Sequence, residues 1–230
     1  TYYEEKHDKG TFVKNIISDN IMLGDIYMRA KELRVATDVP RGVFVIRSLK
    51  KGESVPTDVI QTQFPDRQND FVLSVGEGDV VLIRQMPEGS GIKELNKIAA
   101  SVEESLRAGN DPTVVVGIGT IAIHLRDLAK SYKEAQIAIE VGKVFDNEKY
   151  VITYENLGIG RLIYQLPTTL CEMFLQEVFK KNPIDALDKE TLFTIHKFFE
   201  NNLNVSETAR KLFVHRNTLV YRLDKIKKLT

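Results

Sequence analysis

The stretch VSETARKLFVHRNTLVYRLDKIKKL, residues 205–229, gathers the side chains with the clearest chemical potential. Arginines, lysines, a histidine, an asparagine and a tyrosine alternate there with evenly spaced aliphatic residues. Guanidinium and amide groups can form paired hydrogen bonds with the edges of DNA bases, and ammonium groups can pair with phosphates. Two interpretations follow: a surface that contacts DNA, or a basic face on a helical bundle that only meets solvent.

The apolar spacing in this stretch predicts two short helices with a tight connection. Asn204 or Ser206 is a suitable N-cap for the first helix, over residues 207–213. Its inner side is predicted to hold Ala209, Leu212 and Phe213. The residues VHRN are too few for anything but a tight turn, and Asn217 or Thr218 then opens the second helix. The polar side chains are therefore expected on a compact helix pair.

The second predicted helix has an apolar stripe and an opposite polar face. Leu219, Leu223 and Ile226 recur at four- and three-residue spacing, so they form the buried stripe. A further amphipathic helix precedes the pair and ends at Asn201-Asn202. Three helices with a short link between the last two are helix-turn-helix geometry, in which the last helix enters the major groove.

The residues predicted to bind DNA lie mainly on that polar face and on the turn before it. Arg216 can fork onto guanine, and Asn217 can pair with adenine. The others can reach phosphates or bases. The full candidate set is Lys211, His215, Arg216, Asn217, Thr218, Tyr221, Arg222, Lys225 and Lys228.

Charge is distributed unevenly along the chain. The 230 residues have a formal net charge of zero, but residues 204–230 hold seven Lys or Arg and two Asp or Glu. The remaining residues hold 25 basic and 30 acidic groups. A basic end on an otherwise acidic chain favours a polyanion partner for that end only.

The composition is that of an ordinary globular protein, with 43% hydrophobic residues. The single cysteine, Cys171, cannot form an internal disulfide, which favours a reducing, cytoplasmic compartment, and it is predicted to be a small buried core residue. No segment is long and apolar enough to span a bilayer, and no signal peptide is visible. Because the chain begins with threonine, we expect it to be a piece of a longer protein.

The pattern before residue 157 predicts an α+β unit in the order β-α-β-β-α-β-α-β, with a mainly antiparallel sheet. Residues 1–35 are predicted to be helical. Predicted strands cover residues 43–49, a hairpin over 71–85 that turns at Gly76-Glu77-Gly78, residues 113–119 and residues 150–154. Predicted helices follow Pro56, run from Gly91 to near Gly109-Asn110, and cover 124–142. From residue 157 onward only helical patterns remain, so the fold class is α+β followed by an all-α region.

The remaining polar residues do not form a recognisable catalytic or metal site. Histidines outside the C-terminal stretch are scattered without metal-ligand spacing. The residues VGIG contain too few glycines for a dinucleotide fingerprint and are better interpreted as a strand end. We therefore predict no catalytic residue, no cofactor and no metal.

The words SETARKLFVHRNTLVYRLDKI closely resemble the C-terminal helix-turn-helix of the CdaR/PucR family of bacterial transcriptional regulators. These proteins govern sugar-diacid and purine catabolism, among other pathways. The resemblance is dense over residues 188–229 and implies a Fis-type helix-turn-helix. It also implies contact positions on the second motif helix at Arg216, Asn217, Thr218, Tyr221 and Arg222.

The resemblance extends more loosely over residues 40–154. SVGEGDVVLI looks like the signature hairpin of a degenerate GGDEF-like domain, and the element order agrees with that domain. Three segments are therefore expected: an N-terminal helical linker over 1–38, a degenerate GGDEF-like α+β domain over 39–156, and a helical DNA-binding domain over 157–230. The helix-turn-helix would occupy 205–229 of the last segment.

The middle domain is not expected to be an enzyme. Cyclases that carry an intact signature bind metal-bound nucleotide phosphates with one acid from the first strand and another from the signature turn. Here the first strand has no carboxylate, and Arg47 would repel a metal. The turn keeps Glu77 and Asp79 in altered order. Dimerisation or signal relay is the expected role.

These observations predict a DNA-binding transcriptional regulator of a bacterial catabolic operon. Its expected partners are double-stranded operator or promoter DNA and a second copy of itself, as a homodimer or higher homo-oligomer, with no membrane. A small-metabolite effector would bind an upstream domain outside this chain. Two alternatives are open: a metal-dependent nucleotide-processing enzyme with a helical tail, or a structural dimerisation module.

Overall fold

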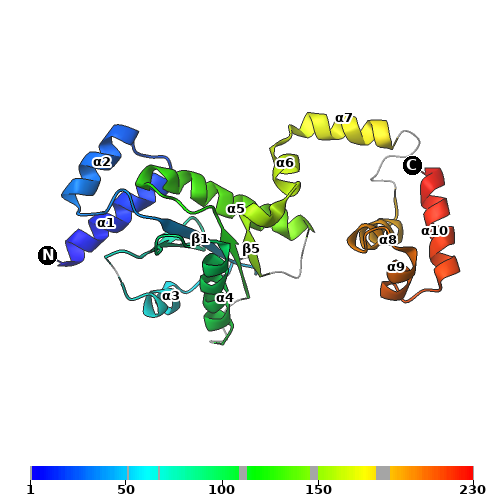
Figure 1. Ribbon diagram of the computed structural model, residues 1–230, viewed down its shortest axis with the longest axis horizontal. Coiled ribbons are helices and arrows are strands. Elements are labelled where there is room, and N and C mark those ends of the chain that lie inside the picture. The colour runs from blue at the N-terminus through cyan, green and yellow to red at the C-terminus, as the bar shows by residue number, and fades with distance from the viewer. Residues whose placement is uncertain are drawn as a thin grey trace. The chain divides into compact units, whose positions relative to one another are not determined.

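The chain folds into two compact units, Thr1–Tyr164 and Gln165–Thr230 (Figure 1). The computed structural model describes residues 2–50, 52–66, 68–108, 113–145, 150–179 and 187–229. Within these residues, no helix combines the length and the apolar character that crossing a membrane requires.

The first unit is built on a five-stranded sheet with the strand order β2-β3-β1-β4-β5. The strands are β1 (Arg41–Ser48), β2 (Phe71–Val75), β3 (Asp79–Gln85), β4 (Val114–Ile118) and β5 (Val151–Thr153). Three of the four pairings are antiparallel, and β4 pairs with β5 in parallel. The mainly antiparallel sheet predicted from the sequence is therefore confirmed.

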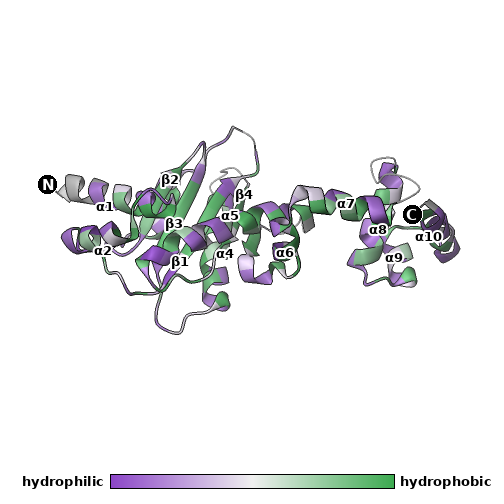
Figure 2. Cartoon of the chain, turned by 90° about the horizontal axis from the view of Figure 1, so that it is seen from above, coloured by the Kyte–Doolittle hydropathy of each residue, from purple (hydrophilic) through white to green (hydrophobic). Residues whose placement is uncertain are grey.

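Helices cover both faces of this sheet, because the strands are apolar on both sides. Val43 and Val45 of β1 join one buried cluster, which also contains residues of α1, α2 and α5. Phe44 and Ile46 point the other way, into a cluster with α3 and α4. Figure 2 shows the strands in largely hydrophobic colours. The helices and short 3-10 turns are α1 (Tyr2–Ile17), α2 (Leu23–Glu32), α3 (Thr57–Gln63), α4 (Ile92–Ala108), η1 (Leu125–Asp127), α5 (Leu128–Phe145) and η2 (Tyr154–Leu157).

The predicted element order is confirmed, with one detail that the sequence pattern did not give. The region predicted to be helical, residues 1–35, is divided into two helices, α1 and α2. Asp19, just after α1, has a φ of 56°, a backbone conformation that cannot continue a right-handed helix. The predicted stop of α4 at residues 109–110 lies outside the described residues, since α4 is described as far as Ala108.

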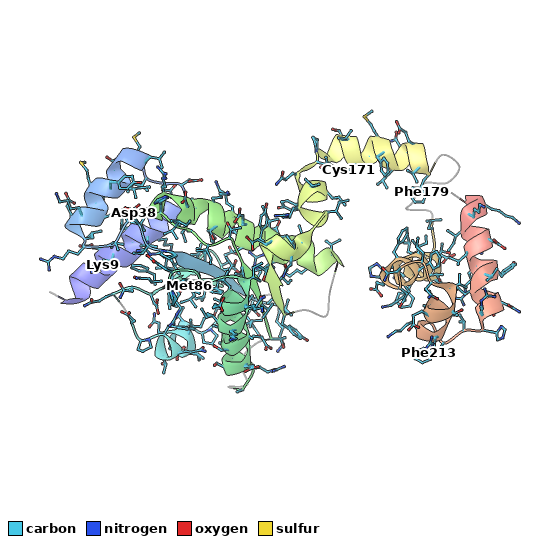
Figure 3. All side chains as sticks on the ribbon, in the orientation of Figure 1. Lys9, Asp38, Met86, Cys171, Phe179 and Phe213 are labelled. Carbon is cyan, nitrogen blue, oxygen red and sulfur yellow. The ribbon has the colours of Figure 1, made fainter. Side chains whose placement is uncertain are left out.

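The second unit is helical in its described part. Its helices are α7 (Thr168–Val178), α8 (Lys189–Glu200), α9 (Val205–Lys211) and α10 (Arg216–Leu229), and α6 (Gly160–Gln165) leads into it. Cys171 lies on α7, a helix with no buried residue, and is only partly covered (Figure 3). The prediction that Cys171 is a buried core residue is therefore wrong.

Candidate nucleic-acid interface

Helix α9 begins where its capping chemistry predicts. The side-chain Oδ1 of Asn204 accepts a hydrogen bond from the backbone N–H of Glu207 at 3.0 Å. This bond satisfies one of the backbone donors that a helix N-terminus leaves free. Of the two N-caps that the sequence offered, Asn204 is the one used. Thr208 and Ala209, on the next turn, are buried.

The end of α9 differs from the prediction. The helix ends at Lys211, and Phe213 takes a φ of 55° in the connecting turn. The backbone N–H of Phe213 donates to the carbonyl of Arg210 at 3.2 Å, which closes the helix end. Because the chain leaves the helical path here, the Phe213 ring turns outward and is 96% exposed (Figure 3). The prediction that Phe213 faces inward is wrong.

Helix α10 packs on α9 and α8 through the predicted apolar stripe. Leu219 is fully buried, and Leu223 and Ile226 are partly buried. The helix begins at Arg216, one residue before Asn217 and two before Thr218, the two predicted starts. The three helices α8, α9 and α10 therefore form a packed group in which one face of α10 is committed to the core.

His215 has a structural role that the sequence reasoning missed. It stands immediately before α10, and its ring Nδ1 accepts a hydrogen bond from the backbone N–H of Asn217 at 3.3 Å. Its backbone carbonyl accepts from the N–H of Leu219 at 3.2 Å. His215 thus caps the helix as well as lying among the candidate DNA-binding residues. Only its position directly before a helix hints at this role in the sequence.

Eight of the nine candidate residues are exposed, and they lie at the end of α9, on the turn after it and on α10. The exposed set is Lys211, His215, Arg216, Asn217, Thr218, Tyr221, Lys225 and Lys228. The positive end of the helix dipole and the free backbone N–H groups of the first turn add to their positive charge. Figure 2 shows α10 in largely hydrophilic colours. The arrangement suits a polyanion that can come into contact with the first turn of α10.

Arg222 is the ninth candidate residue, and it is held within the protein. Its Nη2 lies 2.6 Å from Oε1 of Glu190 on α8, and its side chain is 30% exposed. The guanidinium therefore ties α10 to α8. The prediction that Arg222 contacts DNA stays a prediction, and such a contact would have to replace the ion pair with Glu190 or form beside it.

The signature hairpin of the first unit, β2 and β3 with the turn between them, is the second candidate for a binding or catalytic site. A cavity of about 320 Å³ lies beside its turn, lined by residues that include Arg47, Glu77, Asp79 and Tyr132. Arg47 and Asp79 form an ion pair, with Nη2 and Oδ2 2.7 Å apart. The hydrogen bond to Asp79 raises the pKa of the Arg47 guanidinium, so this cation persists.

The residues at the hairpin do not fit a divalent metal ion. A magnesium ion requires free carboxylate oxygens, and the Asp79 carboxylate is already bound by a fixed positive charge. Strand β1 carries no Asp or Glu. Among the described residues, no group of three or more His, Cys, Asp or Glu side chains is placed to hold a metal.

Comparison with known families matches both units in order along the chain. Residues 19–141, more than half of the chain, match the GGDEF-like domain, and residues 191–230 match the PucR C-terminal helix-turn-helix domain. The second match covers most of α8 and all of α9 and α10, and therefore includes every candidate DNA-binding residue.

Three curated relatives are similar over about half of this chain. The Purine catabolism regulatory protein of Bacillus subtilis is 31% identical over 121 residues, which are 51% of this chain and 22% of that protein. The Proline-responsive transcriptional activator PutR of Bacillus subtilis is 31% identical over 123 residues, 51% of this chain and 29% of that protein. The Carbohydrate diacid regulator of Escherichia coli is 29% identical over 117 residues, 50% of this chain and 30% of that protein.

The matched part is thus less than a third of each of these relatives. The two family matches follow each other in the expected order. They agree with the signature hairpin in the first unit and with the three packed helices in the second. The chain belongs to the CdaR/PucR type of regulators, with a GGDEF-like domain followed by a PucR-type helix-turn-helix.

Proposed function

We propose that this chain is the DNA-binding part of a transcriptional regulator of a bacterial catabolic operon. The second unit would place α10 in the major groove, with its first turn against base edges. Arg216 and Asn217 would read bases, and Lys211, Lys225 and Lys228 would pair with phosphates. The relatives, named as regulators of purine, proline and carbohydrate-diacid responses, support this proposal.

One observation carries the proposal: α10 buries Leu219, while Arg216 at its first residue and the nearby Asn217, Thr218 and Tyr221 are exposed. A merely solvated basic helix has no need to present an asparagine, a threonine and a 72% exposed tyrosine beside its cations. These groups can hydrogen-bond to bases and contact sugars. Their concentration on the first turns of α10 matches the part of a recognition helix that reaches base edges.

The GGDEF-like domain is, in this proposal, a non-catalytic module for dimerisation or signal relay. The chain would bind operator DNA as a homodimer or higher homo-oligomer, because the described residues of each chain offer one such recognition helix, α10. A small metabolite would bind a further domain of the whole protein.

The experiment is fluorescence anisotropy of the chain with promoter fragments of its own operon and with scrambled DNA, over a salt series. We expect tighter binding to promoter DNA and a log affinity that falls linearly with log salt concentration. Arg216→Ala should cost about 1–3 kcal/mol of binding free energy and reduce the preference for promoter over scrambled DNA.

Arg210→Ala is the matched control. Arg210 lies on α9, is 75% exposed in its side chain and pairs with Glu207 at 2.7 Å, but it is not a candidate contact. It should bind as the parent does. If the parent binds promoter and scrambled DNA with equal affinity, the chain does not recognise a DNA sequence. If Arg210→Ala and Arg216→Ala lose the same binding free energy, Arg216 contributes only its positive charge and does not contact a base.

A further inference from the structure

Arg47 and Asp79 face each other across two neighbouring strands. Strands β1 and β3 are antiparallel, with Ile46 opposite Val80, so the next position along each strand brings Arg47 opposite Asp79. Directly opposed side chains of an antiparallel pair interact most strongly. Here the pair joins the end of β1 to the first residue after the signature turn.

The contact between them engages both carboxylate oxygens. The Nε of Arg47 donates to Oδ1 of Asp79 at 3.0 Å and to Oδ2 at 3.1 Å. Its Nη2 donates to Oδ2 at 2.7 Å. Two-nitrogen contacts of this kind fix orientation as well as charge, which a lysine at the same place would not do.

The pair is also partly removed from water. The side chains of Arg47 and Asp79 are 26% and 19% exposed, and Tyr132 and Gln136 of α5 line the same cavity. An ion pair in such a setting is screened less than one on an open surface. Removing either partner would leave a mostly covered charge without a counterion.

We propose that Arg47 is the built-in counterion of Asp79, and that this ion pair, not a bound divalent cation, holds the signature turn against β1. The fold family suggests a metal beside this turn, and the guanidinium supplies the positive charge instead. The proposal concerns the first unit alone and does not depend on DNA binding.

Besides the ion pair, the turn is held by the pairing of β2 with β3, in which Val75 lies opposite Asp79, and by one backbone hydrogen bond from the segment before α3. In the described residues, the backbone N–H of Val55 donates to the carbonyl of Gly78 at 3.2 Å, while Gly76 and Gly78 have φ values of 61° and 144°. Loss of Arg47 should therefore loosen the turn without unfolding the sheet, whose strands are held by two buried apolar clusters.

The test is hydrogen exchange measured by mass spectrometry on a peptide that spans Val75 to Val80, in the whole chain. Arg47→Met and Asp79→Asn should each speed exchange in this peptide several-fold. The double variant should lose no more protection than either single variant, because both remove one interaction. Arg47→Lys keeps the positive charge but loses the two-nitrogen contact with the carboxylate. Its exchange rate in this peptide should therefore lie between those of Arg47→Met and the parent.

Lys50→Met is the matched control. Lys50 lines the same cavity, but its contact with Glu53 is 3.5 Å long and its side chain is 66% exposed. Its exchange should equal that of the parent. If Arg47→Met and Asp79→Asn also exchange like the parent, or if their losses simply add in the double variant, the proposed pairing role is wrong.

A second measurement separates the guanidinium from a metal. Adding manganese chloride to the parent should leave exchange in this peptide unchanged, and the electron paramagnetic resonance signal of free manganese should not decrease. A signal that decreases with the parent and is restored by Asp79→Asn would mean that a metal binds Asp79. That outcome would overturn the proposal.

Discussion

At the scale of single residues, Arg222 has two possible roles in DNA binding: it can hold α10 in place through its ion pair with Glu190, or it can contact a phosphate directly. If Arg222 positions α10 through Glu190, then Arg222→Ala and Glu190→Ala should weaken promoter binding similarly, and the double variant should lose little more. The slope of log affinity against log salt should not change, because no phosphate contact is lost. Anisotropy titrations of the three variants over a salt series measure both quantities.

The competing role gives a different pattern in the same titrations. If Arg222 leaves Glu190 to pair with a phosphate in the complex, Arg222→Ala should lower the salt slope by about one. Glu190→Ala would then bind DNA as tightly as the parent or more tightly, because it frees the guanidinium and removes a negative charge from the interface.

Phe213 combines two unfavourable features, an exposed ring and a positive φ. A left-handed conformation costs a residue with a side chain about 1 kcal/mol, and glycine avoids that cost. We therefore expect Phe213→Gly to raise the free energy of unfolding by up to about 1 kcal/mol. Urea unfolding followed by circular dichroism measures this change, provided the m value is unchanged.

Leu203 offers a second test of the same effect. It also has a positive φ, of 62°, and is 53% exposed, but it lies in the turn before α9. Leu203→Gly should stabilise for the same reason. If only Phe213→Gly destabilises the chain, the Phe213 ring makes a packing contact that its exposure does not reveal.

At the scale of elements, the contact of β4 with α5 depends on a residue without a side chain. A Cβ atom at Gly117 would lie 2.2 Å from the backbone carbonyl oxygen of Ala135, which cannot move without moving α5. Gly117→Ala should therefore lower the free energy of unfolding by about 1–3 kcal/mol or more. Gly24→Ala on α2, where nothing lies within 4 Å of the new atom, should be neutral or stabilising.

Thermal unfolding of the two glycine variants gives the comparison. A melting temperature of Gly117→Ala equal to that of the parent would mean that β4 and α5 are less closely packed than described. The sequence words VGIG, interpreted as a strand end, thus also mark a close approach of helix and strand.

The elements themselves could largely be predicted from the sequence, because apolar period and turn residues are local properties. The hairpin at Gly76-Glu77-Gly78 and the cap at Asn204 are examples. The failures concern contacts that local pattern does not contain. The outward turn of Phe213 and the capping by His215 depend on where a helix ends, and the ion pair of Arg222 depends on how α10 crosses α8.

At the scale of the whole molecule, the proposal that α10 is the one DNA-reading helix in the described part of each chain predicts a two-fold complex on DNA. Two copies would place their α10 helices about 34 Å apart, one turn of the duplex. Footprinting on the promoter should show two half-sites with that centre-to-centre spacing, and inserting about half a turn of DNA between them should abolish cooperative binding. A single protected half-site with unchanged affinity would indicate that one chain binds alone.

The strand order of the sheet also has a consequence for how the chain acquires its structure. The central strand, β1, is the first to be synthesised, yet its neighbours are β3 and β4, which end at Gln85 and Ile118. Until those segments exist, β1 is an apolar strand whose backbone N–H and C=O groups are unpaired on both edges. Such a strand can pair with other chains and aggregate. Closing the long loops to β4 and then to β5 costs chain entropy before any contact offsets it. Completion of this sheet should therefore be the slow step of folding, and the growing chain is most vulnerable to aggregation before Val114–Ile118 takes its place beside β1.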